Sequence, residues 1–299
     1  MKEKVLYIYL PINLYSVAHF YKDELWGTSP SAFNDPFDSL VYIDQERIGL
    51  RCDEIYEKTL KNTDETIVGF KKKCLAVINE VFSEARDNFV VSCFTTKNDS
   101  EIMWAHYGNK GTGFVLEYSI DEIKRCIDEY YTHYLEKEHF SSIDFIKAVI
   151  YSNDYVDATE WALDVLSYSI EKELFPLHGK TESSYEEMEC DTKRISLEML
   201  LHKNPCWSYE DEWRAFVVNF NRDAKTKQHF KIGNCKPLSV YLGARISADD
   251  EAFLSRIAKE KRIPIYKMQE KVVDKKYRLV KEKIYDEERV NGSVFWNKQ

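Results

Sequence analysis

The segment NFVVSCFTTKNDSEIMWAHYGNKGTGFVLEYS, residues 88–119, contains the clearest succession of predicted elements in the chain. Its β-branched and aromatic run predicts a strand at 89–94, and Asp99 or Ser100 is placed to cap a following helix that runs through Tyr107. A glycine loop then leads into a second predicted strand at 114–119. These elements place a sheet near the middle of the fold.

Strand-forming segments recur on both sides of this stretch, within residues 5–40 and 205–268. VLYIYL (5–10) predicts the first strand, and another runs from about Trp213 to Phe220. LSVYLGARISADDEAFLSRIAKEKRIPIYKMQ (238–269) predicts strand, helix and strand, with the helix capped near Ser247 or Asp249.

Amphipathic helical spacing fills the intervals between these strand segments, at about 45–88 and 121–204. We therefore predict an α+β fold with one mixed central sheet and two large helical insertions. The predicted domain covers 1–270, and 271–299 is predicted to be a charged C-terminal extension.

The composition limits the classes of function. A chain of 299 residues with 44% hydrophobic content supports a sizeable core, and a net charge of −9 argues against nonspecific coating of nucleic acid. Seven scattered cysteines without a CxxC pair indicate reduced thiols and a cytoplasmic protein. No apolar run is long enough to span a membrane, so no membrane partner is expected. Cysteine and histidine do not cluster, and no metal is expected.

Asn13 is predicted to cap a helix over 13–25. Its apolar residues follow helical spacing and are expected to form one buried stripe, made of Leu14, Val17, Ala18, Tyr21 and Leu25.

The loop TSPSAFNDPFDS (28–39) interleaves turn-forming residues with Phe33 and Phe37, which we expect to be buried and to pin the loop. Asp35 and Asp38 have two interpretations. They make turn-stabilising bonds to the backbone, or they bind a ribose, a metal or a base.

The short helix around Trp104 also has two interpretations. In the first, Met103 and Tyr107 face the core and His106 is exposed or hydrogen-bonded. In the second, Trp104 or Tyr107 stacks on a flat ring and His106 lies beside a phosphate or ribose. The neighbouring GNKGTG is a weak anion motif, because it lacks the known phosphate-loop spacings.

YEDEWR (209–214) places Glu210 and Glu212 two residues apart at the start of a strand, so both side chains should point to the same side, as should Arg214. Two carboxylates at such a position suit glycosyl chemistry, in which they orient a ribose and stabilise an oxocarbenium-like centre. Alternatively, Arg214 neutralises Glu212 in a structural ion pair.

Other chemistries receive less support. No GxSxG elbow is present, and a nucleophilic role for Cys93 has no supporting pattern. A metal-dependent nuclease that uses Asp35, Asp38, His106 and Glu212 is a third hypothesis, which the acidic balance and the missing metal spacing disfavour.

Four motifs together resemble the bacterial and phage-associated domain-of-unknown-function 2971 family. They are LWGTSPSAFNDPFDS, SCFTTKNDSEIMWAHYG with GFVLEYS, WSYEDEWRAF and YLGARIS, in the family's order between residues 5 and 268. The family name implies no activity.

A more remote resemblance is to ADP-ribosyltransferases, particularly the DarT-like toxins that modify DNA. It implies that residues 7–10 form the first NAD-contacting strand and that Glu212 is the catalytic glutamate, with Glu210 completing an ExE-like pair. Ile8 and Leu10 stand where related sequences carry polar or basic residues. Under this resemblance another residue, such as His19 or Arg214, replaces them, or the ligand has been lost or changed.

The resemblance therefore implies an enzyme that transfers ADP-ribose or cleaves NAD, acting as a bacterial toxin or in phage defence. A nucleic-acid or protein acceptor and a defence-system partner are the expected partners. The alternative is a non-catalytic sensor or partner-binding module. The predicted catalytic residues are Glu212, Glu210 and His106, and the predicted ligand-binding residues are Ser29, Asn34, Asp35, Asp38, Trp104, Tyr107 and Arg214. We expect these side chains to line one cleft, with residues 121–204 forming a wall or cover.

Overall fold

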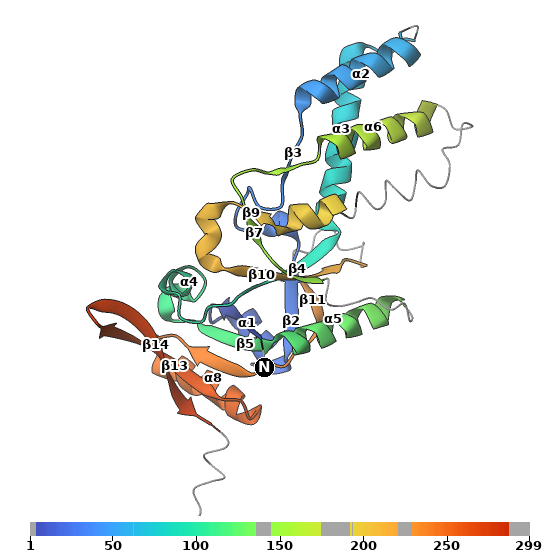
Figure 1. Ribbon diagram of the computed structural model, residues 1–299. Coiled ribbons are helices and arrows are strands. Elements are labelled where there is room, and N and C mark those ends of the chain that lie inside the picture. Colours follow the sequence, from blue (N-terminus) through green and yellow to red (C-terminus); the bar gives the residue numbers. More distant parts are fainter. Residues whose placement is uncertain are drawn as a thin grey trace, which may run out of the picture.

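The computed structural model describes residues 4–61, 63–135, 145–174, 192, 194–220 and 229–286. Its base is a ten-stranded sheet, and a group of helices rises from one side of it (Figure 1). The sheet strands are β1 (Val5–Leu10), β2 (Glu24–Thr28), β4 (Phe89–Thr95), β5 (Phe114–Ser119), β6 (Ile146–Ala148), β10 (Glu212–Val218), β11 (His229–Asn234), β12 (Ser239–Leu242), β13 (Ile265–Val273) and β14 (Lys276–Tyr285).

The main strand order is β11-β2-β4-β1-β5-β12-β13-β14, and β10 pairs with β4 and β6 outside this path. β12 and β13 are parallel, whereas β1 and β5, like β4 and β10, are antiparallel. The predicted α+β fold with a mixed central sheet is therefore confirmed.

The sheet splits between β1 and β4. β1 pairs with β5 from Val5 to Leu10, but it pairs with β4 only at Tyr7 and Thr95. β4 instead pairs along its whole length with β10. The ladder does not continue from this pair to Tyr9 and Cys93, and both of these residues line a pocket.

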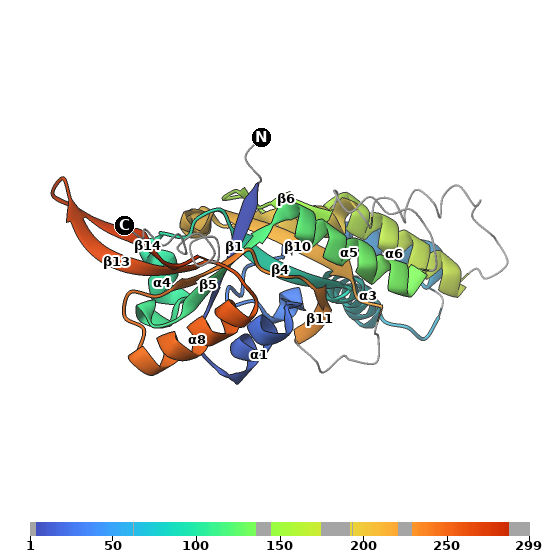
Figure 2. The same cartoon turned by 90° about the horizontal axis from the view of Figure 1, so that it is seen from below.

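The alternation of side chains along β1 defines the two faces of the sheet. Leu6, Ile8 and Leu10 belong to the main core, which also contains residues of α1 (Leu14–Lys22), α5 (Ile120–Leu135) and α8 (Ala248–Glu260). Figure 2 shows α1 and α8 side by side. Tyr7 and Tyr9 point to the opposite face, where the short helix α4 (Glu101–His106) packs against them.

Side-chain caps fix the starts of three predicted helices. Asn13, Ser100 and Ser247 each accept a hydrogen bond from the backbone N–H three residues later, at the N-termini of α1, α4 and α8. Such caps satisfy N–H groups that have no partner inside the helix. The three caps agree with the sequence prediction.

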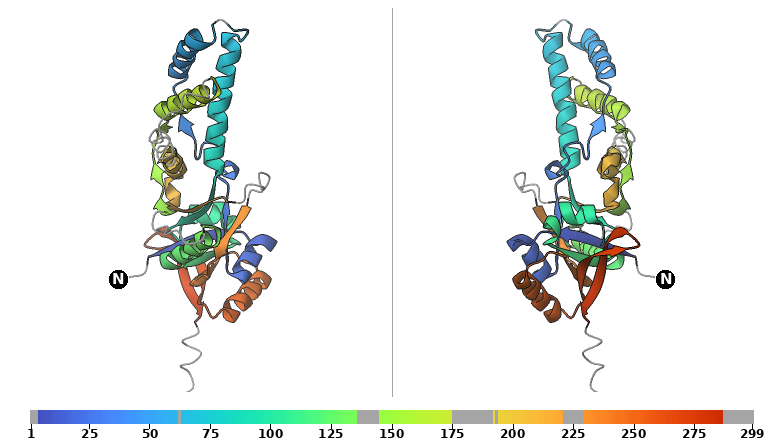
Figure 3. Two further views of the ribbon diagram at one scale, coloured as in Figure 1. Left: turned by 90° about the vertical axis from the view of Figure 1, so that its right-hand side faces the viewer. Right: turned by 90° about the vertical axis from the view of Figure 1, so that its left-hand side faces the viewer.

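Parts of the two predicted insertions pack against each other as one helical lobe, whereas α5 of the second insertion packs on the main core. α2 (Gln45–Thr59), α3 (Ile67–Asp87) and α6 (Thr159–Leu174) share a separate core that includes Phe70, Ile78 and Trp161. Figure 3 shows α3 rising from the sheet with α2 and α6 beside it. β3 (Val41–Tyr42) also pairs with β8 (Val156–Asp157), which joins the two insertions at their base.

The second insertion is not purely helical. Besides α5, α6 and helical residues 194–201, it contains β6, β7 (Ile150–Tyr151), β8 and β9 (His202–Lys203). β7 and β9 pair with each other, and β6 joins the main sheet through β10. The short 3₁₀ helices η1 (Pro30–Ala32), η2 (Asn109–Gly111) and η4 (Pro205–Glu210) lie in connections.

The predicted buried stripe of the first helix is confirmed only in part: Leu25, which lies in β2, is buried and Val17 packs against the main core, whereas Leu14 and Tyr21 are exposed. α1 ends at Lys22, and its buried residues are Ser16 and Phe20. Leu14 and Tyr21 are 81% and 59% exposed and, with Val17 and Ala18, border a shallow groove against α8. The core receives Phe20, which the predicted stripe did not include, and the edge of the stripe at Val17.

Two further expectations need correction. Phe37 is 63% exposed, so of the two phenylalanines in the 28–39 loop only Phe33 packs inward. Phe33 contacts the small core around Phe216. The sheet also continues past residue 270, because β13 and β14 form a long hairpin that pairs from Ile265↔Tyr285 to Val273↔Lys276.

Candidate functional site

A pocket of about 220 Å³ lies where the sheet splits, and we call it the carboxylate pocket. β1 supplies Tyr7, Ile8 and Tyr9, β4 supplies Cys93 and Thr95, and α4 leads into Tyr107. Phe33 and Asn34 come from the 28–39 loop. The walls are therefore partly aromatic.

Five charged side chains form one end of this pocket, and all are buried. The exposed fractions are 4% for Asp38, 7% for Lys203, 4% for Glu210, 3% for Glu212 and 1% for Arg214. Charges this deeply buried are stable only when they are paired, since desolvation of a single ion is very unfavourable. With all five ionised, the group carries a net charge of −1.

Arg214 lies at the centre of the buried group. Its guanidinium makes two hydrogen bonds to Asp38, from Nη1 to Oδ1 at 2.9 Å and from Nη2 to Oδ2 at 2.6 Å, and Nε donates to Glu212 Oε1 at 2.8 Å. The ring of Phe33 stacks on it at 4.9 Å. This two-pronged geometry fixes the loop that carries Asp38 against the strand that carries Arg214.

Lys203 bridges the two glutamates. Its Nζ donates to Glu210 Oε2 at 2.6 Å and to Glu212 Oε2 at 2.9 Å, and it lies 5.1 Å from the ring of Trp207. Burial alone would lower the pKa of Lys203, but the two glutamates raise it above its ordinary value. Lys203 is therefore a permanent cation in the pocket.

The two glutamates have opposite pKa shifts. Burial alone would raise the pKa of Glu212, but the charges of Arg214 and Lys203 lower it to about 2. Burial raises the pKa of Glu210, and the opposing effects of Lys203 and Tyr107 do not cancel that rise. Pairs of carboxyl groups whose pKa values are separated by their surroundings are typical of acid–base sites.

Tyr107 connects Glu210 to the rim of the pocket. Its hydroxyl donates to Glu210 Oε1 at 2.5 Å and accepts a hydrogen bond from Asn34 Nδ2 at 3.1 Å. Burial raises the pKa of Tyr107, and the hydrogen bond to Glu210 raises it further. The hydroxyl therefore stays protonated and orients Glu210.

Cys93 is the one thiol in the pocket among the described residues. Its side chain is exposed, but desolvation by the surrounding protein atoms raises the pKa of Cys93 well above that of an ordinary thiol, and the charge of Glu212 raises it further. Since the thiolate is the reactive form, Cys93 is a weak nucleophile at neutral pH.

The structure brings together part of the predicted site. Six of the predicted residues line the carboxylate pocket, namely Asn34, Asp38, Tyr107, Glu210, Glu212 and Arg214. The ion pair between Arg214 and Glu212, which was the structural alternative, also forms, and it forms inside the pocket.

The other four predicted site residues do not line this pocket. The Ser29 hydroxyl donates to Asp87, and Asp35 accepts a hydrogen bond from the backbone N–H of Phe37, as the turn interpretation predicted. Trp104 is buried and donates its Nε1–H to the carbonyl of Asn98.

His106 faces the hydroxyl of Tyr209, with Nδ1 at 3.3 Å. The expectation that all the predicted side chains line one cleft is therefore wrong. α4 turns Met103 and Tyr107 toward the pocket and carries Trp104 and His106 away from it.

Sequence reasoning missed Lys203, the side chain that links the two glutamates. Among the described residues of 121–204, Lys203 alone lines the pocket, so the described part of this segment contributes one side chain to the predicted wall. A lysine placed just before Asn204 and Pro205, upstream of the acidic run at Glu210, was the available signal.

The fold and the pocket define an α+β protein with buried, paired carboxylates at a split sheet. The family model described as "Protein of unknown function (DUF2971)" matches residues 103–215, which confirms the resemblance to this family that the motifs predicted. Comparison with curated proteins and with solved structures gave no match. Tyr107, Lys203, Glu210, Glu212 and Arg214 lie inside the matched segment, whereas Asn34 and Asp38 lie before it.

Among the described residues, no group of three or more histidine, cysteine or acidic side chains is arranged to hold a metal ion. None of the described helices has the length and apolar character needed to cross a membrane.

Proposed function

We propose that the carboxylate pocket binds the nicotinamide–ribose part of NAD and that the protein cleaves the bond between them, transferring ADP-ribose to an acceptor or to water. The observation that carries this proposal is the pair of glutamates with opposite pKa shifts at the end of a partly aromatic pocket. An ionised carboxylate such as Glu212 stabilises the positive charge that develops on the ribose in such a reaction.

The proposed reaction breaks the bond between ribose C1′ and the ring nitrogen, whose electron pair leaves with neutral nicotinamide. A hydroxyl group or water then bonds to C1′, and its proton passes to the carboxylate of Glu210. The raised pKa of Glu210 favours proton acceptance, and Tyr107 holds the carboxylate in place. Tyr7, Tyr9 and Phe33 offer flat surfaces for the nicotinamide ring.

Nicotinamide release from NAD tests this proposal, measured with water, DNA, RNA and protein as acceptors. We expect Glu212→Gln to lower the rate by about 100-fold or more, because a charge-stabilising group is lost. Glu260→Gln, in an exposed ion pair on α8, is the matched control and should keep the wild-type rate. Thermal unfolding of each variant separates lost catalysis from lost folding. Absence of nicotinamide release with every acceptor would exclude the enzyme.

A non-catalytic binding module is the second candidate, and one observation favours it. Both carboxylate oxygens of Glu212 already have cationic partners, since Oε1 contacts Arg214 and Oε2 contacts Lys203. Alkylation of Cys93, measured at a pH high enough to form its thiolate, reports NAD binding, and nicotinamide release then distinguishes the two candidates. NAD should slow alkylation of Cys93 and leave that of the exposed Cys206 unchanged; protection without nicotinamide release would support the module.

The wider role that we propose is that of an effector in a bacterial toxin or phage-defence system, acting on a nucleic-acid or protein acceptor in the cytoplasm. The six described cysteines are free thiols, which supports a reducing compartment. The metal-dependent nuclease is less well supported, because Asp38 and Glu212 are both bound by Arg214, while Asp35 and His106 lie outside the pocket.

A further inference from the structure

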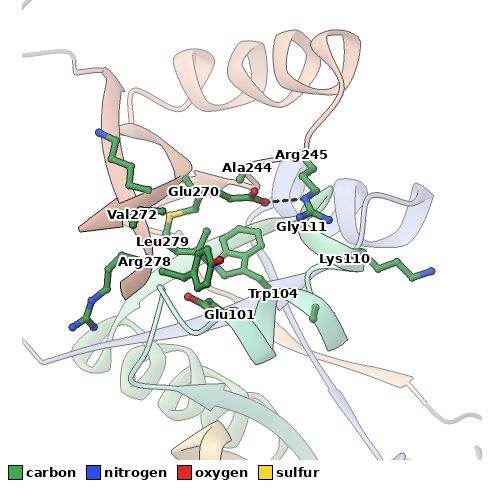
Figure 4. A pocket seen from close by; sticks show the side chains of 14 residues that line it. Glu101, Trp104, Lys110, Gly111, Ala244, Arg245, Glu270, Val272, Arg278 and Leu279 are labelled. Atoms are coloured by element: carbon green, nitrogen blue, oxygen red, sulfur yellow. Dashed lines mark hydrogen bonds and ion pairs between the residues drawn. The ribbon is translucent and has the colours of Figure 1, made fainter. Parts of the chain in front are cut away.

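A second and larger groove, of about 690 Å³, lies between α4 and the β13–β14 hairpin, and we call it the hairpin groove (Figure 4). α4 contributes Glu101, Trp104 and Ala105 to this groove and Met103 to the carboxylate pocket, so one short helix borders both. The proposed NAD chemistry makes no use of the hairpin groove.

The floor of the hairpin groove is apolar. Trp104 and Met268 are 3% and 1% exposed, and Leu279 packs beside them. Toward the tip of the hairpin the apolar side chains become accessible, since Val272 is 69% and Tyr277 is 81% exposed. Val272 and Tyr277 are directly opposite in the ladder and therefore share one face. Exposed apolar side chains that continue a groove are typical of a binding surface.

The rim of the groove is basic in an acidic protein. Residues 265–285 contain seven lysines and arginines and three acidic residues, a net charge of +4 in a chain whose total is −9. Figure 4 shows Arg278 and Lys110 on opposite sides of the groove. Within the described part of the chain, Lys110, Lys271 and Arg278 form no ion pair, whereas Arg245 pairs with Glu270. The unpaired cations attract a negatively charged ligand.

The hairpin also presents a free strand edge. β14 ends the strand order of the sheet, and over Lys276–Tyr285 it pairs only with β13 among the described residues. The base of the hairpin is fixed by the stacking of Tyr241 on Tyr266, at 4.8 Å, with Lys281 over both rings. The outer N–H and C=O groups of a fixed edge strand are a template for an added strand.

We propose that the hairpin groove binds an extended acidic segment of a partner protein. The segment adds as a strand to the free edge of β14 and places apolar side chains beside Tyr277 and Leu279, which continues the apolar face that Val272 shares. Its carboxylates lie near Arg278, whose cross-strand neighbour is Lys271. A nucleic acid would use the cations and Tyr277, but it would leave the strand edge and the apolar floor without matching groups. The observations therefore favour a peptide.

Fluorescence anisotropy with the full chain tests the proposal. The probe is a labelled peptide of about ten residues, enough to pair along β14, that alternates glutamate with valine or phenylalanine. We expect binding that weakens as salt is added, and about a tenfold loss in the double variant Lys271→Glu/Arg278→Glu. The double variant Lys58→Glu/Lys72→Glu, at two exposed lysines on α2 and α3, makes the same change of charge on the lobe and should leave binding unchanged.

Two backbone-methylated probes test the strand addition itself. Alternate residues of an added strand point their N–H groups toward β14 and away from it. N-methylation of one alternate set should abolish binding, and methylation of the other set should preserve it. Equal affinity of the two methylated probes would overturn the proposal.

Failure of the unmodified peptide to bind at about 1 mM would also overturn the proposal. So would tighter binding of a single-stranded oligonucleotide that is lost in the same double variant, since that result would identify a nucleic-acid surface.

Discussion

Glu210 and Glu212 are two residues apart and share Lys203, yet their pKa values shift in opposite directions. Glu212 also has Arg214, whose guanidinium is the strongest partner in the group. Glu210 has a neutral tyrosine hydroxyl instead, so burial dominates its pKa. The difference between the two carboxylates therefore comes from one additional cation.

This difference predicts opposite pH dependences for two glutamine variants. The folded-state pKa of Glu212 is about 2 against an ordinary value of 4.5, so its contribution to stability is present above pH 4.5 and is lost as the pH falls toward 2. Glu212→Gln should be less stable than the wild type at neutral pH, and the gap in the free energy of unfolding should narrow between pH 4.5 and 2.

Glu210→Gln provides the contrast. Because the folded-state pKa of Glu210 is raised, its carboxyl group contributes to stability below pH 4.5, and this contribution is lost as the pH rises. The pH-dependent part of the difference in the free energy of unfolding between the wild type and Glu210→Gln should therefore have the opposite sign to that of Glu212→Gln. Urea unfolding at a series of pH values measures both gaps. Gaps that stay constant with pH would contradict the assignment of the two shifts.

At the residue scale, the sequence predicted what depends on local spacing. Glu212 and Arg214 lie on one side of β10 because alternate strand residues share a face. Lys203 and Asp38 were not recognised as their partners, because these residues come from other elements and Asp38 is 176 positions from Arg214. No periodic pattern records such a contact.

At the scale of elements, the glycine loop after α4 is held by the turn after β12. The backbone N–H of Gly243 donates to the carbonyl of Gly113 at 2.9 Å, and that of Arg245 donates to the carbonyl of Gly111 at 2.9 Å. A Cβ atom on Gly243 would collide with the Gly111 carbonyl. This close approach of two backbones fixes the end of α4, which borders both pockets.

Two glycine variants test the importance of this contact. Gly243→Ala should lower the free energy of unfolding by about 1–3 kcal/mol, because the backbones must separate. Gly49→Ala is the matched control, since no atom lies within 4 Å of the added Cβ on α2, and it should stabilise the protein by about 0.5–1 kcal/mol. Urea unfolding measures both, and equal effects of the two changes would mean that the backbone contact does not matter.

The elements that were predicted from sequence are those with a clear cap or alternation, such as β4, α4, β5 and α8. The start of β13 agrees with the strand predicted at the end of 238–269, whereas the end of β13 and all of β14 fall in the predicted charged extension from residue 271, where lysines and glutamates interrupt the apolar residues. The turn of the β13–β14 hairpin also lacks glycine, although Asp274 and Lys275 both have positive φ, as a tight hairpin turn requires.

At the scale of the whole molecule, two separate cores meet at the buried charges. The sheet and the helical lobe each have a hydrophobic core. Asp38 lies where the chain leaves the sheet for the lobe, Lys203 lies where it returns, and Arg214 lies in the sheet. The charged group therefore joins the lobe to the sheet, and local unfolding of the lobe should be separable from that of the sheet.

Trp161→Ala tests this separation. Trp161 is 4% exposed in the lobe core and packs against Phe82 with ring centroids 4.6 Å apart, so its removal should destabilise the lobe by about 3–5 kcal/mol. Hydrogen exchange should then accelerate in α2, α3 and α6, while β1 and β5 stay protected. Leu116→Ala, in the sheet core, is the contrasting control and should accelerate exchange in the strands. Equal acceleration of exchange in all elements by both variants would contradict this prediction. It would mean that the lobe and the sheet unfold as one cooperative unit.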